Sequence, residues 1–557
     1  MKNILLVGSV GSGKSTTIGA LLKNNATGFN KTHDALLKQI DRYDTENEIF
    51  WDADGFGESI ENDLILEESI VSLIRRENID GERVVNTILI VVDLSTRDLG
   101  TEYKLISDIL MPNLGKNQNI IIGLNQCDFA MKGKNWDSEK NEPNENLKSF
   151  LRNKVLSIKE RLKESTSLDI EPIYFSALYG YNIDNLYQCI TNDMDVERFN
   201  NRENSVDDDS SSNNVKTKHT LSQQVEEANK AHMGESLFTA NDNFAAIRSI
   251  DEVCISIENE LEKADINYDD RKLIIERLTE IKNQELNIML VGGTGAGKSS
   301  TINALFGENV AVVGESVNPQ TDKIEKYSLS KVTLWDTPGL GDSPQADERY
   351  SKQIIDMLNE NNSVGKRLID VVLVVIDASA QELGTSYRLI NDVIMPNVGD
   401  ERRVLIALNQ CDFAMKGKYW DHATNTPKPR LESFLREKAM SVSGRIKEST
   451  GVEVVPVYYS ALYKYNIAKL FFYLLDSTPD EKRINLIPQM NKNVRVWDKN
   501  DSNYDYKENI NKTARESYQD TFSRVLRGIP KDFMHIIFNV VDGFVDGFID
   551  IMRKHKR

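Results

Sequence analysis

A glycine-rich stretch decides the fold of this chain, and it occurs twice: LVGSVGSGKSTT at residues 6–17 and LVGGTGAGKSST at residues 290–301. Both stretches fit the pattern G-x-x-x-x-G-K-S, in which a loop between a strand and a helix wraps its backbone N–H groups around phosphate oxygens. An apolar run precedes each stretch and a helix-forming run follows it. A glycine-rich turn without a ligand is the alternative, but spacing, context and duplication together favour a phosphate site.

Each residue type in these loops has an expected role. Lys14 and Lys298 are predicted to contact the β- and γ-phosphates, and Ser15 and Ser299 to hold Mg²⁺. The other loop positions expected to contact a nucleotide are Gly8, Gly11, Gly13 and Thr16 in the first stretch, and Gly292, Thr294, Gly295, Gly297 and Ser300 in the second.

The repeat extends far beyond these loops. Lys14 and Lys298 are 284 positions apart, and so are Asp52 and Asp336. Residues from about 2 to 190 therefore recur from about 286 to 474, and we call these ranges copy one and copy two. Continuous β-branched runs such as TILIVVD and VVLVVID alternate with helical stretches, which is typical of a mostly parallel sheet covered by helices on both faces. The sequence predicts an α/β fold with two duplicated domains.

Two further motifs follow each phosphate loop. Copy two reads LWDTPGLGDS at residues 334–343, where Asp336 can orient Mg²⁺ and the Gly339 N–H can sense a γ-phosphate. LNQCDFAMKGK occurs at residues 124–134 and again at 408–418, after another apolar run in each copy. We expect the carboxylate of the second motif to lie at the mouth of each fold, above the phosphate loop.

These motifs together resemble the translation-factor-related P-loop GTPases, whose base-reading motif is [NT]-K-x-D. The segment GGTGAGKSSTINALFG is most similar to those of septin-like, immunity-related and Era-like members. The resemblance implies two G domains that bind GTP and GDP with Mg²⁺. The residues implied to read guanine are Asn125 and Asp128, Asn409 and Asp412, with Ser176, Ala177, Ser460 and Ala461 at the family's S-A-K position. Gln126 and Gln410 depart from the family, because they replace its lysine.

The copies differ where hydrolysis is concerned. Thr321 in copy two suits a switch residue that closes on Mg²⁺, whereas the position 284 before it is Leu37, which cannot ligate a metal. Thr32 would substitute only after a shift of its loop, and Asp54 adds negative charge to copy one. We predict that copy two hydrolyses GTP through Lys298, Thr321 and Gly339, and that copy one binds a guanine nucleotide with slow or no turnover. The predicted metal ligands are Ser299, Thr321 and Asp336 in copy two, and Ser15 and Asp52 in copy one.

Neither copy has the glutamine that positions water in many small GTPases. Phe56 and Leu340 occupy that place, and Gly11 and Gly295 exclude a potassium-recruiting asparagine in the phosphate loops. We therefore expect slow basal hydrolysis that is stimulated by association. The two copies can pair within one chain, or the protein can self-associate.

The rest of the chain yields a domain plan. We predict a first G domain at 1–196, a flexible acidic linker at 197–242, a helical segment at 243–285, a second G domain at 286–476 and a tail at 477–557. The tail reads as polar and irregular before a last amphipathic helix, which carries Asp542, Asp546 and Asp550 on one face. Its apolar face is expected to pack on the protein itself, with a partner helix second and a membrane surface third.

Composition limits the class of function. The net charge of −18 argues against nucleic acid as a partner. The four cysteines are far apart and the chain has no long apolar run, so a cytoplasmic location is expected. The leading interpretation is a regulatory GTPase whose nucleotide state controls assembly or a partner. The alternatives are a dynamin-like or immunity-type membrane or defence GTPase, a ribosome-associated GTPase, and an ATPase.

Overall fold

The computed structural model describes most of the chain. The described residues are 1–25, 30–33, 37–57, 60–95, 99–133, 135–166, 168–192, 249–264, 266–307, 310–311, 323–362, 365–381, 383–501, 505–525, 527 and 531–553. The predicted linker at 197–242 and the predicted switch residue Thr321 lie outside these residues.

Copy one is built on a seven-stranded sheet with the order β2-β3-β4-β1-β5-β6-β9. From β4 to β9 neighbouring strands run parallel, and β2 and β3 add an antiparallel edge. The strands are β1 (Lys2–Val7), β2 (Asn30–His33), β3 (Ile40–Asp44), β4 (Glu48–Ala53), β5 (Thr87–Asp93), β6 (Asn119–Asn125) and β9 (Ile173–Tyr174).

Copy two is built on a six-stranded sheet with the order β11-β12-β10-β13-β14-β17. Its five strands from β12 to β17 are parallel and follow the same order as the parallel strands of copy one. The strands are β10 (Leu286–Gly292), β11 (Glu325–Leu329), β12 (Val332–Asp336), β13 (Val371–Asp377), β14 (Val404–Asn409) and β17 (Val457–Tyr458). Two small hairpins, β7 (Trp136–Asp137) with β8 (Glu142–Pro143) and β15 (Trp420–Asp421) with β16 (Thr426–Pro427), follow the base loops.

Helices cover both faces of each sheet. In β1, Leu5 and Val7 join one apolar cluster while Ile4 and Leu6 join another, as expected when successive side chains alternate between faces. The helices of copy one are α1 (Lys14–Asn25), α2 (Ile60–Arg75), α3 (Gly100–Lys104), α4 (Glu145–Thr166) and α5 (Ile183–Asn192). Those of copy two are α10 (Lys298–Phe306), α11 (Pro344–Asn359), α12 (Gly384–Arg388), α13 (Met395–Val398), α14 (Pro429–Thr450) and α15 (Ile467–Ser477). The predicted α/β fold with mostly parallel sheets is confirmed, while the domain boundaries stay a prediction.

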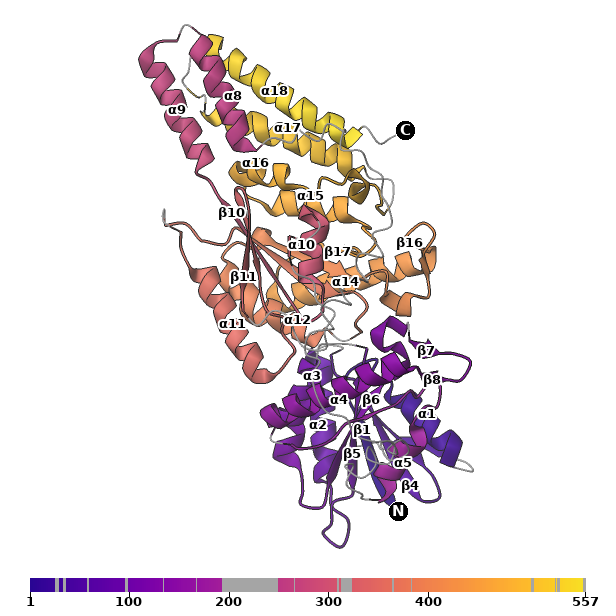
Figure 1. Cartoon of the computed structure of the whole chain (residues 1–557). Helices are drawn as coiled ribbons and strands as arrows, with labels where there is room; N and C mark the ends of the chain where they lie inside the picture. Colours follow the sequence, from indigo (N-terminus) through magenta and orange to yellow (C-terminus); the bar gives the residue numbers. More distant parts are fainter. Residues whose placement is uncertain are drawn as a thin grey trace, which may run out of the picture.

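A helical layer covers copy two at the end away from copy one (Figure 1). It consists of α8 (Ile250–Lys263), α9 (Tyr268–Lys282), α17 (Tyr506–Val525) and α18 (Lys531–Arg553). Ser249 begins α8 with a capping box, because its hydroxyl accepts the Glu252 N–H and the Glu252 carboxylate accepts the Ser249 N–H.

The stretch after α15 is more ordered than its sequence indicates. It forms short helical turns, including α16 (Arg483–Leu486) and a 3₁₀ turn at Val494–Trp497. Trp497 is buried, stacks edge-on against Phe471 and donates its indole N–H to the Asn491 carbonyl at 3.0 Å. The prediction of a polar, irregular segment is wrong here. Isolated apolar residues of this stretch, which show no helical period in the sequence, pack together in one apolar core.

The last helix packs on its own protein. Ile537, Val541 and Val545 of α18 are buried in the apolar cluster that also holds α8 and α17. On the aspartate face, Arg515 of α17 pairs with Asp546. Of the three expected surfaces for this helix, the structure therefore uses the first. Within the described residues, no helix combines the length and the apolar character that crossing a membrane requires.

Candidate nucleotide sites at the carboxyl edges of the two sheets

The two phosphate loops have the same geometry. Lys298 donates from Nζ to the carbonyl oxygens of Gly292 and Gly293 at 3.2 and 3.3 Å, and Lys14 donates to those of Gly8 and Ser9 at 3.2 and 2.9 Å. Burial lowers the pKa of Lys14 to about 8 and lowers that of Lys298 as well. Nearby carboxylates, chiefly Asp52 and Asp336, offset only part of this burial cost, so an anion placed in the loop would stabilise the charged form.

The loop backbone leaves no room for side chains at two glycines. Gly292 has φ +153°, and a Cβ built on it would lie 2.0 Å from the Val375 carbonyl oxygen. Gly297 has φ +90°, and its Cβ would lie 2.3 Å from the amide nitrogen of Asn409. Helix α10 starts directly after Gly297, so its first N–H groups, which have no intrahelical acceptor, open toward the loop.

An acidic residue lies at the end of the strand beside each loop, where Asp336 is the last residue of β12 and Asp52 the last but one of β4. The Ser299 hydroxyl donates to Oδ2 of Asp336 at 2.7 Å. Burial raises the pKa of Asp336 and of Asp52, and Oδ1 of each carboxylate is buried without a hydrogen-bond partner among the described residues. A hydroxyl beside an unsatisfied carboxylate oxygen is the hard-oxygen donor set that Mg²⁺ takes when phosphates supply further ligands. No group of three or more His, Cys, Asp or Glu that would hold a metal alone occurs in the described part of the chain.

The segment after this acid lies directly on the phosphate loop. The Thr294 N–H donates to the Leu340 carbonyl at 2.8 Å, and the Leu340 N–H donates to the Gly292 carbonyl at 3.3 Å. A Cβ on Gly339 would come within 2.4 Å of Thr294 Cα. Gly339 is thus placed where its loop meets the phosphate loop, as expected for a residue that senses a γ-phosphate.

An asparagine ties the base loop to the phosphate loop in each copy. The Asn409 amide donates to the Ala296 carbonyl at 2.9 Å, and its oxygen accepts the Ala461 N–H at 3.1 Å. Asn125 makes the same two bonds in copy one, to the Ser12 carbonyl and from the Ala177 N–H. Each copy therefore brings together its phosphate loop, its base motif and its Ser-Ala motif.

The base-loop acids lie beside these asparagines. Asp128 and Asp412 are both buried, and Oδ1 of Asp128 has no hydrogen-bond partner among the described residues. Ser176 and Ser460 are fully buried and precede the alanines that the asparagines hold. Thr16 and Ser300 lie in the first turns of α1 and α10.

The glutamines that replace the family lysine keep a contact with the phosphate loop. Gln410, at φ +61°, donates from Nε2 to the Gly295 carbonyl at 2.8 Å and to Asp377 at 3.0 Å. Gln126 donates to the Gly11 carbonyl at 2.9 Å. The role of Asp377, at the end of β13, was not anticipated, although its position at a strand end next to the base loop was a usable signal.

Copy one carries a buried acid that copy two lacks. Glu102 is buried and accepts the Ser9 hydroxyl at 2.6 Å, next to the phosphate loop. The corresponding position in copy two is Ser386. Asp54, which drew attention in the sequence, is exposed. Glu102 is therefore the stronger source of negative charge near the copy-one loop, and no local motif marked it.

The other predicted differences between the copies are only partly described. Leu37, 284 positions before Thr321, is buried in the apolar core of copy one and offers no ligand. Thr32 lies in β2, where its hydroxyl is 3.5 Å from an Asp44 carboxylate oxygen.

Comparison with known proteins identifies the domain in copy two. Residues 287–410 match the family model described as 50S ribosome-binding GTPase. The chain is 36% identical over 135 residues to interferon-gamma-inducible GTPase 10 of Mus musculus, covering 22% of this chain and 32% of that protein. It is 23% identical over 219 residues to GTPase Der of Buchnera aphidicola, covering 38% of this chain and 43% of that protein. The chain thus spans less than half the length of these curated relatives.

Solved structures align over a similar fraction of the chain. Toc33 from Arabidopsis thaliana, in complex with Mg²⁺ and GMPPNP, aligns with 37% of this chain and 82% of its own at 18% identity and a TM-score of 0.24. Era, in complex with MgGDPNP and a 16S ribosomal RNA fragment, aligns with 34% of this chain and 55% of its own at 22% identity and a TM-score of 0.22.

Proposed function

We propose that this chain, which carries a P-loop GTPase domain of the kind found in immunity-related and Era- or Der-type proteins, is a guanine-nucleotide switch made of two G domains. The main support is the asparagine that joins the phosphate loop to the base loop in each copy, because it places a purine-reading carboxylate at a set distance from a triphosphate-binding loop. Copy two hydrolyses GTP, and copy one holds a guanine nucleotide with slow or no turnover.

The residues divide the work in copy two. Lys298 exchanges its carbonyl contacts for β- and γ-phosphate oxygens, and the N–H groups at the start of α10 neutralise more of the phosphate charge. Asp412 accepts hydrogen bonds from the guanine edge, which adenine cannot supply. Mg²⁺, held by Ser299, Asp336 and Thr321, would neutralise charge on the phosphates. Gly339 then reports loss of the γ-phosphate to its loop.

Copy one is less suited to a triphosphate. Glu102 adds a buried negative charge beside the phosphate loop, and the sequence position 284 before Thr321 holds Leu37, which offers no metal ligand. We therefore assign copy one a regulatory role. The free, buried cysteines fit the cytoplasmic location that belongs to the same proposal.

Base choice is the most direct test. Labelled GDP is bound to the wild type and competed with GTP, GDP or ATP, and the same titration is repeated with Asp412→Asn and Asp128→Asn. The wild type should discriminate against ATP by at least about a hundredfold, and each substitution should erode that ratio at its own site. Equal competition by ATP and GTP would show that the chain is not a guanine-nucleotide switch.

The site of turnover is tested separately. Lys298→Ala should abolish GTP hydrolysis, and Lys14→Ala should leave a measurable rate. Hydrolysis that survives Lys298→Ala but is lost with Lys14→Ala would reverse the assignment of the two copies. Phosphate release is the readout, with nucleotide content measured on the same samples.

To bind a membrane, the last helix α18 would have to detach from the helices that cover its apolar face. The apolar side chains of α18 that would enter a lipid surface, Ile537, Val541 and Val545, are covered by the protein's own helices. We therefore expect no binding of the wild type to anionic liposomes. Co-sedimentation that depends on residues 531–553 would instead favour the membrane alternative.

A further inference from the structure

The loops that follow the sheet strands of the two copies face each other. Arg161 of α4 in copy one reaches Asp342 in the loop after β12 of copy two, with 3.4 Å between Nη1 and Oδ1. Both side chains are largely shielded, at 13% and 9% exposure, so water screens this ion pair only weakly. Next to it, the Leu99 N–H donates to the Gly341 carbonyl at 3.1 Å.

The reverse contact exists at the equivalent place. Arg445 of α14 in copy two donates to the Gly57 carbonyl of copy one at 3.3 Å. Arg161 and Arg445 are 284 positions apart, as are Gly57 and Gly341. Equivalent arginines of the two copies therefore contact equivalent loops of the opposite copy, which is the reciprocity expected of a two-fold interface.

Equivalent residues also meet each other across the interface. Phe129 and Phe413 are 284 positions apart, and their ring centroids lie 6.2 Å from one another. Lys416 of copy two lies 4.6 Å above the Phe129 ring. Two equivalent side chains touch only near an approximate two-fold axis, so the copies form an internal dimer within one chain.

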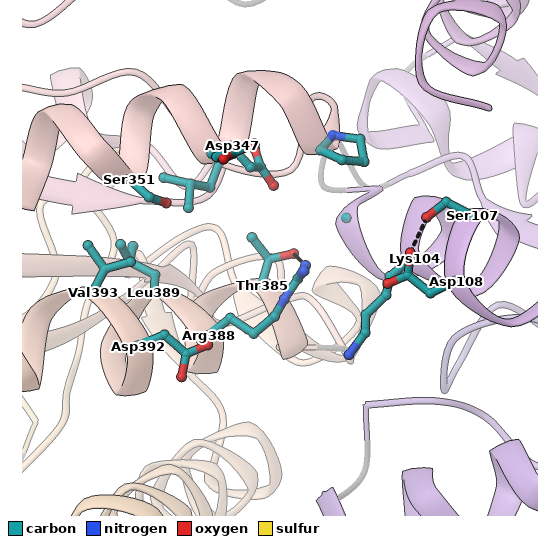
Figure 2. Close-up of a pocket in the computed structure, with 14 residues that line it drawn as sticks. Lys104, Ser107, Asp108, Asp347, Ser351, Thr385, Arg388, Leu389, Asp392 and Val393 are labelled. Atoms are coloured by element: carbon teal, nitrogen blue, oxygen red, sulfur yellow. Dashed lines mark hydrogen bonds between the residues drawn. The ribbon is translucent and has the colours of Figure 1, made fainter. Parts of the chain in front are cut away.

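A cavity of about 340 Å³ lies in the same interface. Figure 2 shows Lys104 and Asp108 of copy one across it from Arg388 and Asp392 of copy two, which are their counterparts 284 positions later. The charges are mixed and the lining is partly exposed, so we assign the cavity no ligand. It marks where the internal dimer is incompletely packed.

The interface reaches both phosphate loops. Asp342, which pairs with Arg161, also attracts the buried ammonium of Lys298 within copy two. On the other side, the Gln381 side chain of copy two lies against the phosphate loop of copy one, since a Cβ on Gly11 would fall 1.7 Å from Gln381 Oε1. Gly341 follows by two positions Gly339, the glycine expected to sense the γ-phosphate, and Gly57 follows Gly55, the counterpart of Gly339 in copy one.

We propose that the two copies regulate each other through this internal dimer. Arg161 couples the nucleotide state of copy one to the γ-phosphate-sensing loop of copy two, and Arg445 couples the nucleotide state of copy two to that loop of copy one. The inference rests on the proposed function and adds that the stimulating partner is the other half of the same molecule. A loop that moves when its nucleotide loses the γ-phosphate changes the arginine contact, and by linkage the contact changes nucleotide affinity in return.

The test is a double variant, Arg161→Ala with Arg445→Ala. Its matched control is Lys163→Ala with Arg436→Ala, which removes two cations from the same two helices whose ion pairs, with Asp169 and Glu432, stay within one copy. GTP turnover per molecule and the release rate of labelled GDP are measured over a hundredfold range of protein concentration, with thermal melting as a check of folding.

We expect wild-type turnover to be independent of protein concentration, and the arginine double variant to lose about tenfold of it while the control keeps it. Phe129→Ala serves as a second variant if the double substitution unfolds, and should weaken turnover in the same direction. Turnover that rises with concentration, or an arginine variant indistinguishable from its control, would overturn the inference. A wild type that binds no guanine nucleotide would instead refute the proposed function.

Discussion

Substitution of Asn409 by alanine tests the architecture of the site most sharply. This amide joins the phosphate loop to the loop that carries Ala461, and only 2% of the side chain is exposed. Alanine would delete both hydrogen bonds and leave the Ala296 carbonyl and the Ala461 N–H buried without a partner. Both groups belong to residues that are only 3% exposed, so their lost hydrogen bonds should disturb the geometry of the site.

The expected magnitude follows from those two bonds. Each is worth about 1 kcal/mol net, and orphaning a buried group adds to that, so the total is about 2 to 3 kcal/mol. If these hydrogen bonds hold the base loop over the phosphate loop, their free energy is lost from GDP binding. GDP affinity at copy two should then fall roughly 30- to 150-fold. The loss should appear mainly as faster release.

Stopped-flow release of labelled GDP measures this effect. Asn125→Ala is the twin at copy one, and the two variants should each accelerate one of two release phases. Asn359→Ala is the control, because that exposed asparagine bonds to Ile355, Asn397 and Arg367, none of which lies in a nucleotide-site motif. A folded Asn409→Ala protein with both release rates within twofold of wild type would refute the idea that this amide organises the nucleotide site.

Three further outcomes are expected. Without nucleotide the pKa of Lys14 is lowered to about 8, and bound phosphate favours the charged form of this lysine. The nucleotide affinity of copy one should therefore fall as pH rises above about 8. Calorimetry in buffers of different ionisation enthalpy would measure the proton uptake that accompanies binding. Glu102→Ser, which installs the residue found at position 386 of copy two, should tighten GTP binding at copy one roughly tenfold by removing a buried like charge, and an unchanged titration would exclude that cause. Val545→Asp should lower the free energy of unfolding by at least about 2 kcal/mol in denaturant titrations, whereas Asn539→Asp at an exposed position of the same helix should change it by less than about 0.5 kcal/mol.

Local sequence was sufficient to find the phosphate loops, the base loops and the strands that carry them. Glycines at required positions, such as Gly297, and continuous apolar runs, such as those of β5 and β13, reflect constraints acting within a few residues. The 284-residue period then predicted where each equivalent side chain would lie. The α/β fold and the P-loop GTPase resemblance followed from these features.

The tertiary structure decided what local patterns do not record. Trp497 gave no helical period, yet it is buried against Phe471, and Glu102 reached the phosphate loop from a helix more than 90 positions away. The pairing of Arg161 with Asp342 joins residues 181 positions apart, and no spacing rule links two such sites. Sequence by itself predicted which loops would bind phosphate and read a base, because backbone geometry and side-chain type act locally. Only the folded chain decided that those loops face each other, because that contact depends on how whole sheets and helices pack.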